Sequence, residues 1–313
     1  MKVLHLSDTQ LSGSPQRISS LLSKYGGIES RHYVWKSSMG FRKFPVDMCL
    51  ENTNSVEVRR LIYEWADIIH YHNRWKRQEI FSVLGEAPPK KPSVIQIHSP
   101  RDSEDFSGEI KSGIPIACPA QYHSRQWPMF RYLVPNVVDI YDPQYMRAEM
   151  PTHERPCISY APSNTNARGW DDKSYGVVAP VLKRMRLRHE VIYDLIDKKP
   201  FSEVMAMKKR ANIGIDEIST GSYHLSSLEY LSLGVLCFAN IDALTEKAVK
   251  DVTGCSLLPW IIADKDCFET TLKKIVSWKT WLGTGAVSRD WMEKYWNPGL
   301  LCKRYIDMYE DLT

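Results

Sequence analysis

The segment from Ala211 to Ala239 constrains the fold of this chain more than any other. It contains an apolar run that ends at Asp216, a loop of small residues around Gly221, a helical stretch that ends at Gly234, and a second apolar run. A strand that leads through a tight loop into a helix and then into another strand is the unit of a parallel α/β sheet. The first turn of such a helix has backbone N–H groups without partners inside the helix, and these groups bind anions, phosphates above all.

The loop and the helix start are therefore candidates for a nucleotide site. We expect the phosphates to contact the residues at the loop end, which are Ser222, Tyr223, His224, Leu225 and Ser226. Glu229 follows within the helix and would accept hydrogen bonds from ribose hydroxyls. An ordinary strand-to-helix connection with a surface glutamate has the same spacing, so the pattern alone leaves both interpretations open.

The remainder of the chain repeats the alternation of strand and helix, which predicts two doubly wound parallel sheets. In the first half we expect strands at 2–7, 31–35, 66–72, 93–98, 113–118 and 132–134, with helices at 15–24 and 56–65. In the second half we expect strands at 157–161, 189–194, 213–216 and 235–239, with helices at 174–185, 201–210 and around Glu229.

A segment rich in Pro, Asp and Met, residues 138–156, separates the two halves and is the best domain linker. We expect an N-terminal domain over 1–147, a C-terminal domain over 148–290 and a terminal helical segment over 291–313. No internal repeat or low-complexity tract is evident.

Composition narrows the class of protein. The chain is 43% hydrophobic and 25% charged, and its net charge of +4 permits an anionic partner without implying one. No apolar run is long enough for a membrane span, and the N-terminus is too polar for a signal peptide. The odd count of 7 cysteines, without a CxxC pair, argues against a disulfide framework or a zinc finger and fits a cytoplasmic protein with buried thiols.

The segment 211–239 also resembles the donor-binding segment of retaining GT-B glycosyltransferases of group 1, the glycogen synthase and mannosyltransferase-like family. Leu228–Gly234, LEYLSLG, is similar to the family pattern LEA(M/L)ALG. The chain departs from the family at Gly221, where a further glutamate is common, and at Val235, where proline is usual. The first departure removes a second carboxylate from the proposed sugar site.

Further matches occur in the expected order along the chain. The strand that ends with His72 and Asn73 resembles the family's aDiiH.Hn segment, and the resemblance implies contact with the acceptor. His98 resembles the histidine of (T/V)xHD, which reaches the transferred sugar, although Ser99 replaces the aspartate. Gly13 lies in the loop after the first strand, which in the family touches the donor phosphate or the acceptor.

The loop after strand 157–161 resembles the family pattern HAPSxxxxKG. Arg168 stands at the lysine position that contacts the donor diphosphate, and Lys173 is the second candidate for this role. A guanidinium supplies the same charge with a bidentate geometry. The resemblance assigns His98, Arg168 and Glu229 to catalysis, and it predicts that the last helix packs on domain one.

The resemblance implies a hexosyltransferase that uses a UDP- or GDP-sugar, retains the anomeric configuration and requires no metal. Leaving-group charge would be stabilised by helix amides and Arg168. We expect a carbohydrate or small-molecule acceptor. Two alternatives remain open. One is transfer to a hydroxymethylated DNA base, as in phage DNA glucosylation, for which 10 tryptophans and 16 tyrosines supply stacking surfaces. The other is an inactive module that binds a nucleotide sugar.

Overall fold

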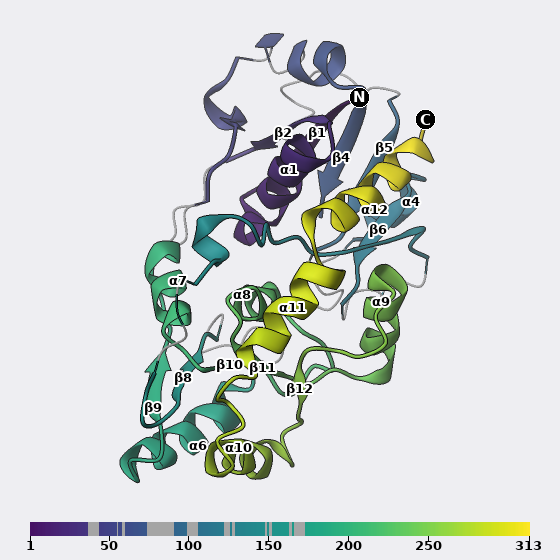
Figure 1. The fold of residues 1–313 in the computed structure, drawn as a ribbon. Coiled ribbons are helices and arrows are strands. Elements are labelled where there is room, and N and C mark those ends of the chain that lie inside the picture. The colour runs from purple at the N-terminus through teal and green to yellow at the C-terminus, as the bar shows by residue number, and fades with distance from the viewer. Residues whose placement is uncertain are drawn as a thin grey trace. The chain divides into compact units, whose positions relative to one another are not determined.

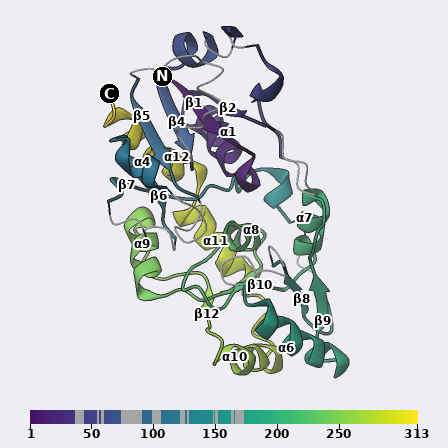
Figure 2. The same ribbon diagram turned by 180° about the vertical axis from the view of Figure 1, so that it is seen from behind.

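The computed structural model describes residues 1–36, 44–54, 56–57, 60–73, 91–98, 106–121, 126, 129–147, 149, 152–162, 165 and 173–313. The chain forms two compact units. Unit 1 comprises residues 1–137 and 298–313, and unit 2 comprises residues 138–297. Figures 1 and 2 show that each unit is a twisted sheet with helices packed against it. No described helix has the length and apolar character that crossing a membrane requires.

Unit 1 is built on a parallel sheet of seven strands in the order β3-β2-β1-β4-β5-β6-β7. The strands are β1 (Lys2–Ser7), β2 (Glu29–Val34), β3 (Met48–Cys49), β4 (Ile68–His72), β5 (Ser93–Gln96), β6 (Ile116–Pro119) and β7 (Tyr132–Val134). The order reverses between β1 and β4. In open α/β sheets, ligands bind beside such a switch point, at the carboxyl ends of the strands.

The helices of unit 1 come from both the N-terminal and the C-terminal parts of the chain. Unit 1 contains the helical segments η1 (Leu11–Gly13), α1 (Ser14–Tyr25), η2 (Leu50–Asn52), η3 (Arg60–Trp65), α4 (Ser107–Lys111) and α12 (Pro298–Glu310). The last helix, α12, packs on α1, where the Sγ atom of Cys302 lies 3.3 Å from the carbonyl oxygen of Leu21. The hydroxyl of Tyr305 donates to the carbonyl of Pro135 at 2.8 Å, which fixes α12 beyond β7.

The two faces of the unit 1 sheet differ in chemistry. Leu4 and Leu6 of β1 belong to an apolar cluster on one face, together with Tyr71 of β4. Side chains alternate along a strand, so His5 and Ser7 belong to the opposite face. That face is buried but polar, and it carries the histidines described below.

Unit 2 is built on a parallel sheet of five strands in the order β12-β11-β10-β8-β9. The strands are β8 (Cys157–Tyr160), β9 (Ile192–Leu195), β10 (Ile213–Glu217), β11 (Leu236–Ala239) and β12 (Ile261–Ile262). The helical segments are η5 (Pro143–Tyr145), α6 (Tyr175–Leu187), α7 (Phe201–Lys209), α8 (Leu225–Ser232), α9 (Ala243–Thr253), α10 (Phe268–Ser277) and α11 (Gly285–Tyr295).

Helix α8 packs unusually close to the central strand of unit 2. A Cβ atom built at Gly214 of β10 would lie 2.5 Å from the Tyr230 ring of α8, a distance that real contacts do not reach. Glycine is therefore required at this position by close approach and not by backbone conformation. The tight contact packs the second half of α8 against the first residues of β10.

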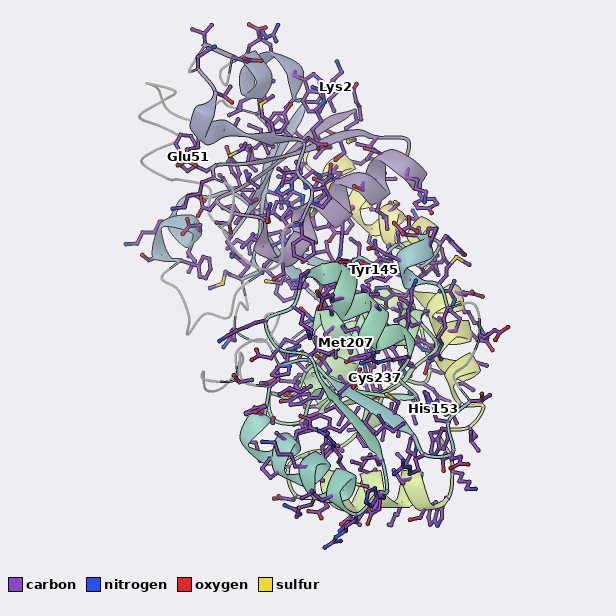
Figure 3. All side chains as sticks on the ribbon, turned by 90° about the vertical axis from the view of Figure 1, so that its left-hand side faces the viewer. Lys2, Glu51, Tyr145, His153, Met207 and Cys237 are labelled. Atoms are coloured by element: carbon purple, nitrogen blue, oxygen red, sulfur yellow. The ribbon has the colours of Figure 1, made fainter. Side chains whose placement is uncertain are left out.

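The prediction of two parallel α/β sheets is confirmed. The short edge strands β3 and β12 and the helices α4, α9 and α10 were not predicted. Within the described residues, the expected helix over 56–65 is α-helical at 56–57 and π-helical over Arg60–Trp65. All 7 cysteines are free thiols and most are buried, as predicted. Cys237 of β11, labelled in Figure 3, is fully buried.

Candidate functional site

The carboxyl end of β10 in unit 2 carries two adjacent buried carboxylates. Glu217 accepts hydrogen bonds from the backbone N–H groups of Ser219 at 2.8 Å and Thr220 at 2.6 Å, and from Ser222 at 3.4 Å. Burial raises the pKa of Glu217, and the nearby His224 and the N–H groups of Ser219 and Thr220 oppose the rise. The carboxylate of Glu217 thus accepts the hydrogen bonds that the loop's own N–H groups can donate, and the first half of the loop folds around it.

Asp216 anchors the second half of the loop. Its carboxylate accepts from the ammonium of Lys173 at 2.9 Å and from the backbone N–H of His224 at the start of α8. Burial by itself would raise the pKa of Asp216, but the charge of Lys173 and the contact with His224 hold it well below its ordinary value. Lys173 is itself buried. Lys173 and His224, both predicted to bind the donor, are thus both hydrogen-bonded to Asp216.

Glu229 of α8 forms the second buried ion pair of this region. Its carboxylate lies 2.6 Å from the ammonium of Lys208 of α7, and the two side chains are 7% and 1% exposed. Lys208 also donates to the hydroxyl of Ser226 at 2.7 Å and lies over the Tyr230 ring. Burial lowers the pKa of Lys208, and Glu229 offsets part of that shift. The pair brings a charge-balanced carboxylate to the first turns of α8.

The other predicted donor residues differ in what they can offer. The Tyr223 side chain is fully buried, and its ring lies 4.9 Å from that of Trp260, so a ligand would reach only its main chain. Ser222 is also fully buried, whereas Leu225 and Ser226 are partly exposed. Their N–H groups belong to the first turn of α8, where the helix itself offers no acceptor.

Arg168 lies outside the described residues. Its predicted contact with the donor diphosphate therefore stays a prediction.

His98 follows β5 at the carboxyl edge of the unit 1 sheet and is partly exposed. Its ring nitrogen Nε2 lies 2.8 Å from Nδ1 of His72. Its backbone N–H donates to Oδ1 of Asn73 at 2.6 Å. Asn73 has a φ of 64°, a left-handed conformation that asparagine tolerates, and its N–H donates to the Gln96 carbonyl.

His72 and Asn73 thus hold His98 in place. Both side chains are buried, with 0% and 4% of their surface exposed. The predicted contact of these two residues with the acceptor is an expectation that the structure leaves untested. What it shows is their use in positioning His98.

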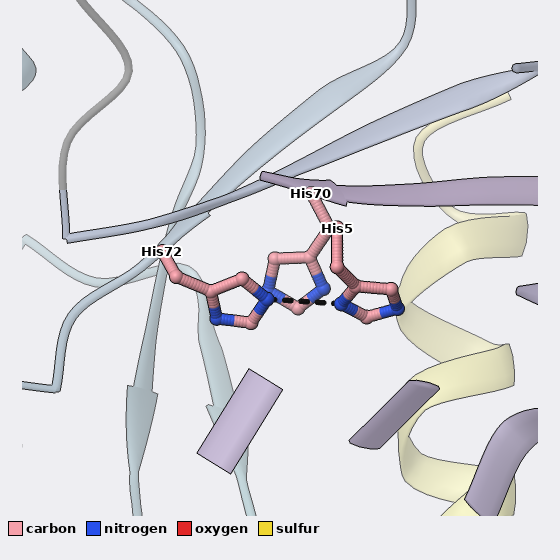
Figure 4. Close-up of side chains that lie close together, drawn as sticks. All are labelled: His5, His70 and His72. Atoms are coloured by element: carbon pink, nitrogen blue, oxygen red, sulfur yellow. Dashed lines mark hydrogen bonds between the residues drawn. The ribbon is translucent and has the colours of Figure 1, made fainter. Parts of the chain in front are cut away.

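Three fully buried histidines form the centre of the polar sheet face. The strand register aligns His5 of β1 with His70 of β4, and His72 lies two residues further along β4. One ring nitrogen of each lies within 4.8 Å of the others, so the three could contribute to a metal site (Figure 4). His70 shares a hydrogen bond of 2.7 Å with the hydroxyl of Tyr309 in α12, so this histidine has a partner within the core.

The ring arrangement favours hydrogen bonding over metal coordination. Nδ1 of His5 lies 2.9 Å from Nε2 of His72. The ring of His72 is nearly parallel to those of His5 and His70, at interplanar angles of 18° and 19°. A zinc ion about 2.0–2.1 Å from each nitrogen would require these rings to turn until the three nitrogens converge.

Burial keeps this group of histidines neutral. It lowers the pKa of His32 and of His98 to about 3. It also lowers the pKa of His5, His70 and His72 well below the ordinary value, and a charge on any neighbouring histidine would lower them further. An uncharged imidazole has one N–H and one bare nitrogen, so each ring can donate once and accept once.

Gly13, the remaining predicted donor contact, has a φ of 80° at the start of α1. A Cβ atom there would lie 2.6 Å from the Phe44 ring. The Phe44 ring therefore occupies the space that the absence of a side chain at Gly13 leaves. Contact of Gly13 with a ligand stays a prediction.

Two residues of the site were missed in the sequence. Lys208 lies on the buried side of α7, four residues after Val204. A lysine on an apolar helix face is the signal that could have revealed its buried partner. His5 has the same strand parity as the histidines of β4, but parity becomes informative only when the strand pairing is known.

Comparisons with known proteins identify the fold. No protein-family model matches the chain, and no curated protein sequence matches it. Solved structures do match. A glycosyltransferase from Rickettsia africae aligns over 100% of this chain and 98% of its own, with 10% identity and a TM-score of 0.61. Sucrose-phosphate synthase from Thermosynechococcus elongatus aligns over 100% and 99%, with 10% identity and a TM-score of 0.58.

A third match carries a ligand. Alr3699/HepE from Anabaena, solved in complex with UDP-glucose, aligns over 99% of this chain and 100% of its own, with 9% identity and a TM-score of 0.60. The chain therefore has the GT-B fold of the glycosyltransferases. Identities near 10% establish the fold alone.

Proposed function

We propose that the chain is a glycosyltransferase that moves a sugar from a nucleoside-diphosphate sugar to an acceptor hydroxyl. The observation that supports it most is the charge-balanced carboxylate of Glu229 beside the first turn of α8, at the carboxyl edge of the unit 2 sheet. This is the edge at which open α/β sheets bind nucleotides. The structural likeness to glycosyltransferases, one of them bound to UDP-glucose, supports the same function.

The roles follow from the chemistry of the donor. The first-turn amides of Leu225 and Ser226, together with Arg168, would stabilise the negative charge that develops on the diphosphate. Glu229 would accept hydrogen bonds from ribose hydroxyls. His98 would contact a hydroxyl of the transferred sugar.

We further propose retention of configuration without a metal. The acceptor proton would pass to the leaving phosphate, so no separate carboxylate base is required. Treatment with EDTA should leave the rate unchanged, and proton NMR of the first product formed should show the anomer of the donor. Activity that disappears in EDTA and returns with Mg²⁺ or Mn²⁺ would contradict this part of the proposal.

Donor binding is tested by thermal unfolding with UDP, GDP, UDP-glucose and GDP-mannose. A ligand at 100 times its Kd should raise the free energy of unfolding by about 2.7 kcal/mol. Activity is tested with the stabilising donor on carbohydrate acceptors and on hydroxymethylated DNA. Binding without transfer to any acceptor would favour an inactive module, and transfer to DNA alone would replace the carbohydrate acceptor. No stabilisation by any of these ligands would reject the proposed function.

The role of Glu229 requires a matched set of variants because of Lys208. Removal of Glu229 alone leaves a buried ammonium without a counter-charge, which typically costs about 3–5 kcal/mol of stability. The single variant Glu229→Ala would therefore lose donor affinity through unfolding as well as through lost contacts.

The double variant Lys208→Met/Glu229→Gln removes both charges and should recover most of the stability. If Glu229 binds ribose, the double variant should still bind UDP at least tenfold more weakly by calorimetry. Lys208→Met with native Glu229 reports the loss of the ammonium, and it should lose stability in the same way as Glu229→Ala because it leaves a buried carboxylate without a counter-charge. Parental UDP affinity in a folded double variant would exclude Glu229 from the nucleotide site.

A further inference from the structure

Strand pairing in unit 1 sets the histidines in two rows on one face of the sheet. His5 of β1 aligns with His32 of β2 and His70 of β4, and Ser7 of β1 aligns with His72 of β4 in the next row. These side chains come from strands far apart in the sequence. Their common parity gathers them on one face, in rows that lead toward the carboxyl end of the sheet, where His98 follows β5. Figure 4 shows three of them, His5, His70 and His72.

Three of these histidines form a continuous hydrogen-bonded chain. Nδ1 of His5 lies 2.9 Å from Nε2 of His72, and Nδ1 of His72 lies 2.8 Å from Nε2 of His98. Both nitrogens of His72 are therefore in use. This series of hydrogen bonds begins at the fully buried His5 and ends at the partly exposed His98.

The donor and acceptor roles in these two hydrogen bonds are coupled through His72. A neutral His72 has one N–H, so it donates at one nitrogen and accepts at the other. If His72 donates from Nδ1, then His5 donates to it, and His98 carries its proton on Nδ1. If His72 donates from Nε2, then His98 donates from Nε2, and the proton of His5 moves to its own Nε2.

The buried end decides between the two states. Nε2 of His5 has no hydrogen-bond partner in the described structure. In the second state this nitrogen would be a buried N–H donor without an acceptor, a rare and costly arrangement. In the first state it is only a bare nitrogen, which adapts more readily to apolar surroundings. The first state is therefore favoured, with Nδ1–H on all three rings.

We propose that His5 and His72 are positioning residues that fix His98 as the Nδ1–H tautomer. His98 then presents a hydrogen-bond donor, and it selects a lone pair of a sugar oxygen rather than a hydroxyl proton. Asn73 complements this chain because its side chain holds the backbone N–H of His98 at 2.6 Å. The tautomer follows from the hydrogen bonds alone, whereas its use on a sugar rests on the proposed function.

The tautomers are measured directly by ¹⁵N NMR of the imidazole rings in the full-length protein at pH 7.5, since the chemical shifts of Nδ1 and Nε2 distinguish the two forms. We expect Nδ1–H for His5, His72 and His98. An Nε2–H tautomer at His98 would overturn the proposal. This measurement does not depend on activity, so an inactive protein with the expected tautomers would reject the proposed function and leave the histidine chain standing.

Two variants at His5 separate hydrogen bonding from packing. The amide nitrogen of His5→Asn can replace Nδ1 as a donor to His72, whereas His5→Leu cannot. Only His5→Leu should release His98 into a mixture of tautomers, and it should lower kcat/KM for transfer by about tenfold, the loss of one hydrogen bond. Equal tautomer populations at His98 in both variants would contradict the role of His5.

His70→Asn is the control for general damage to the core. His70 is equally buried but bonds to Tyr309 outside the chain of three. Its variant should lose stability without changing the tautomer of His98. Elemental analysis of the purified protein tests the competing arrangement. The presence of one equivalent of zinc that is lost in His5→Asn would assign His5, His70 and His72 to a metal site. It would overturn the proposal, because the single lone pair of His72 Nε2 cannot both bind a metal and accept a hydrogen bond from His5.

Discussion

Acid should unfold unit 1 before unit 2, because four histidines of unit 1 are fully buried and neutral. His5, His32, His70 and His72 have 0% of their surface exposed. Burial lowers the pKa of His32 to about 3 and lowers the pKa of the other three well below the ordinary value of 6.5. Below pH 6.5 the unfolded chain binds four protons that the folded unit does not bind. Stability is therefore complete above this pH and is lost as the pH falls.

The magnitude follows from proton linkage. Each buried neutral histidine removes about 1.4 kcal/mol of unfolding free energy per pH unit below 6.5, and the four together remove about 5 kcal/mol between pH 7.5 and pH 5.5. Small domains have about 5–15 kcal/mol in total, so this loss is a large part of the stability of unit 1.

Hydrogen exchange followed by mass spectrometry at pH 7.5, 6.5 and 5.5, corrected for the intrinsic exchange rate, reports each unit by its own peptides. Peptides of β1 and β4 should lose protection on acidification while those of β10 and β11 keep theirs. His32→Gln should reduce the pH dependence of the unfolding free energy of unit 1 below pH 6.5 by about 1.4 kcal/mol per pH unit. His189→Asn, at an exposed position, is the matched control and should leave this pH dependence unchanged. Equal protection of β1 at pH 7.5 and 5.5 would refute the reasoning.

Three further substitutions test the packing. Gly214→Ala should destabilise unit 2 by about 1–3 kcal/mol in urea unfolding because its methyl group would overlap the Tyr230 ring, and a neutral result would show that α8 can move off β10. Arg147→Met should cost about 1.5–3 kcal/mol, since its guanidinium donates to the carbonyls of Ala211 and Gly234, which follow α7 and α8, and an unchanged urea midpoint would exclude this anchoring. Tyr309→Phe should lower the thermal midpoint by removing the partner of His70, with a cost of about 1–3 kcal/mol, whereas an equal midpoint would mean that another group replaces the hydroxyl.

The local pattern of the sequence determined the class of fold. Alternating apolar strands and amphipathic helices encode parallel α/β units through short-range rules of periodicity, so strands such as β1, β4 and β10 were predictable within a few residues. Gly221 and the small residues near it marked the turn before α8. The two-residue strands β3 and β12 were not predictable, because two residues carry no periodicity and are held only by a neighbouring strand.

Only the tertiary structure decided what the polar residues of the candidate site do. Glu229 has the same local sequence whether it is exposed or paired, and its ion pair depends on the packing of α7 against α8, which brings Lys208 within 2.6 Å. Likewise, His72 ends a strand as a ligand-binding residue would, but the register between β1 and β4 places it between His5 and His98. Periodicity specifies the face on which a side chain lies. The partner on that face comes from a distant part of the chain, and only the assembled sheet brings the two together.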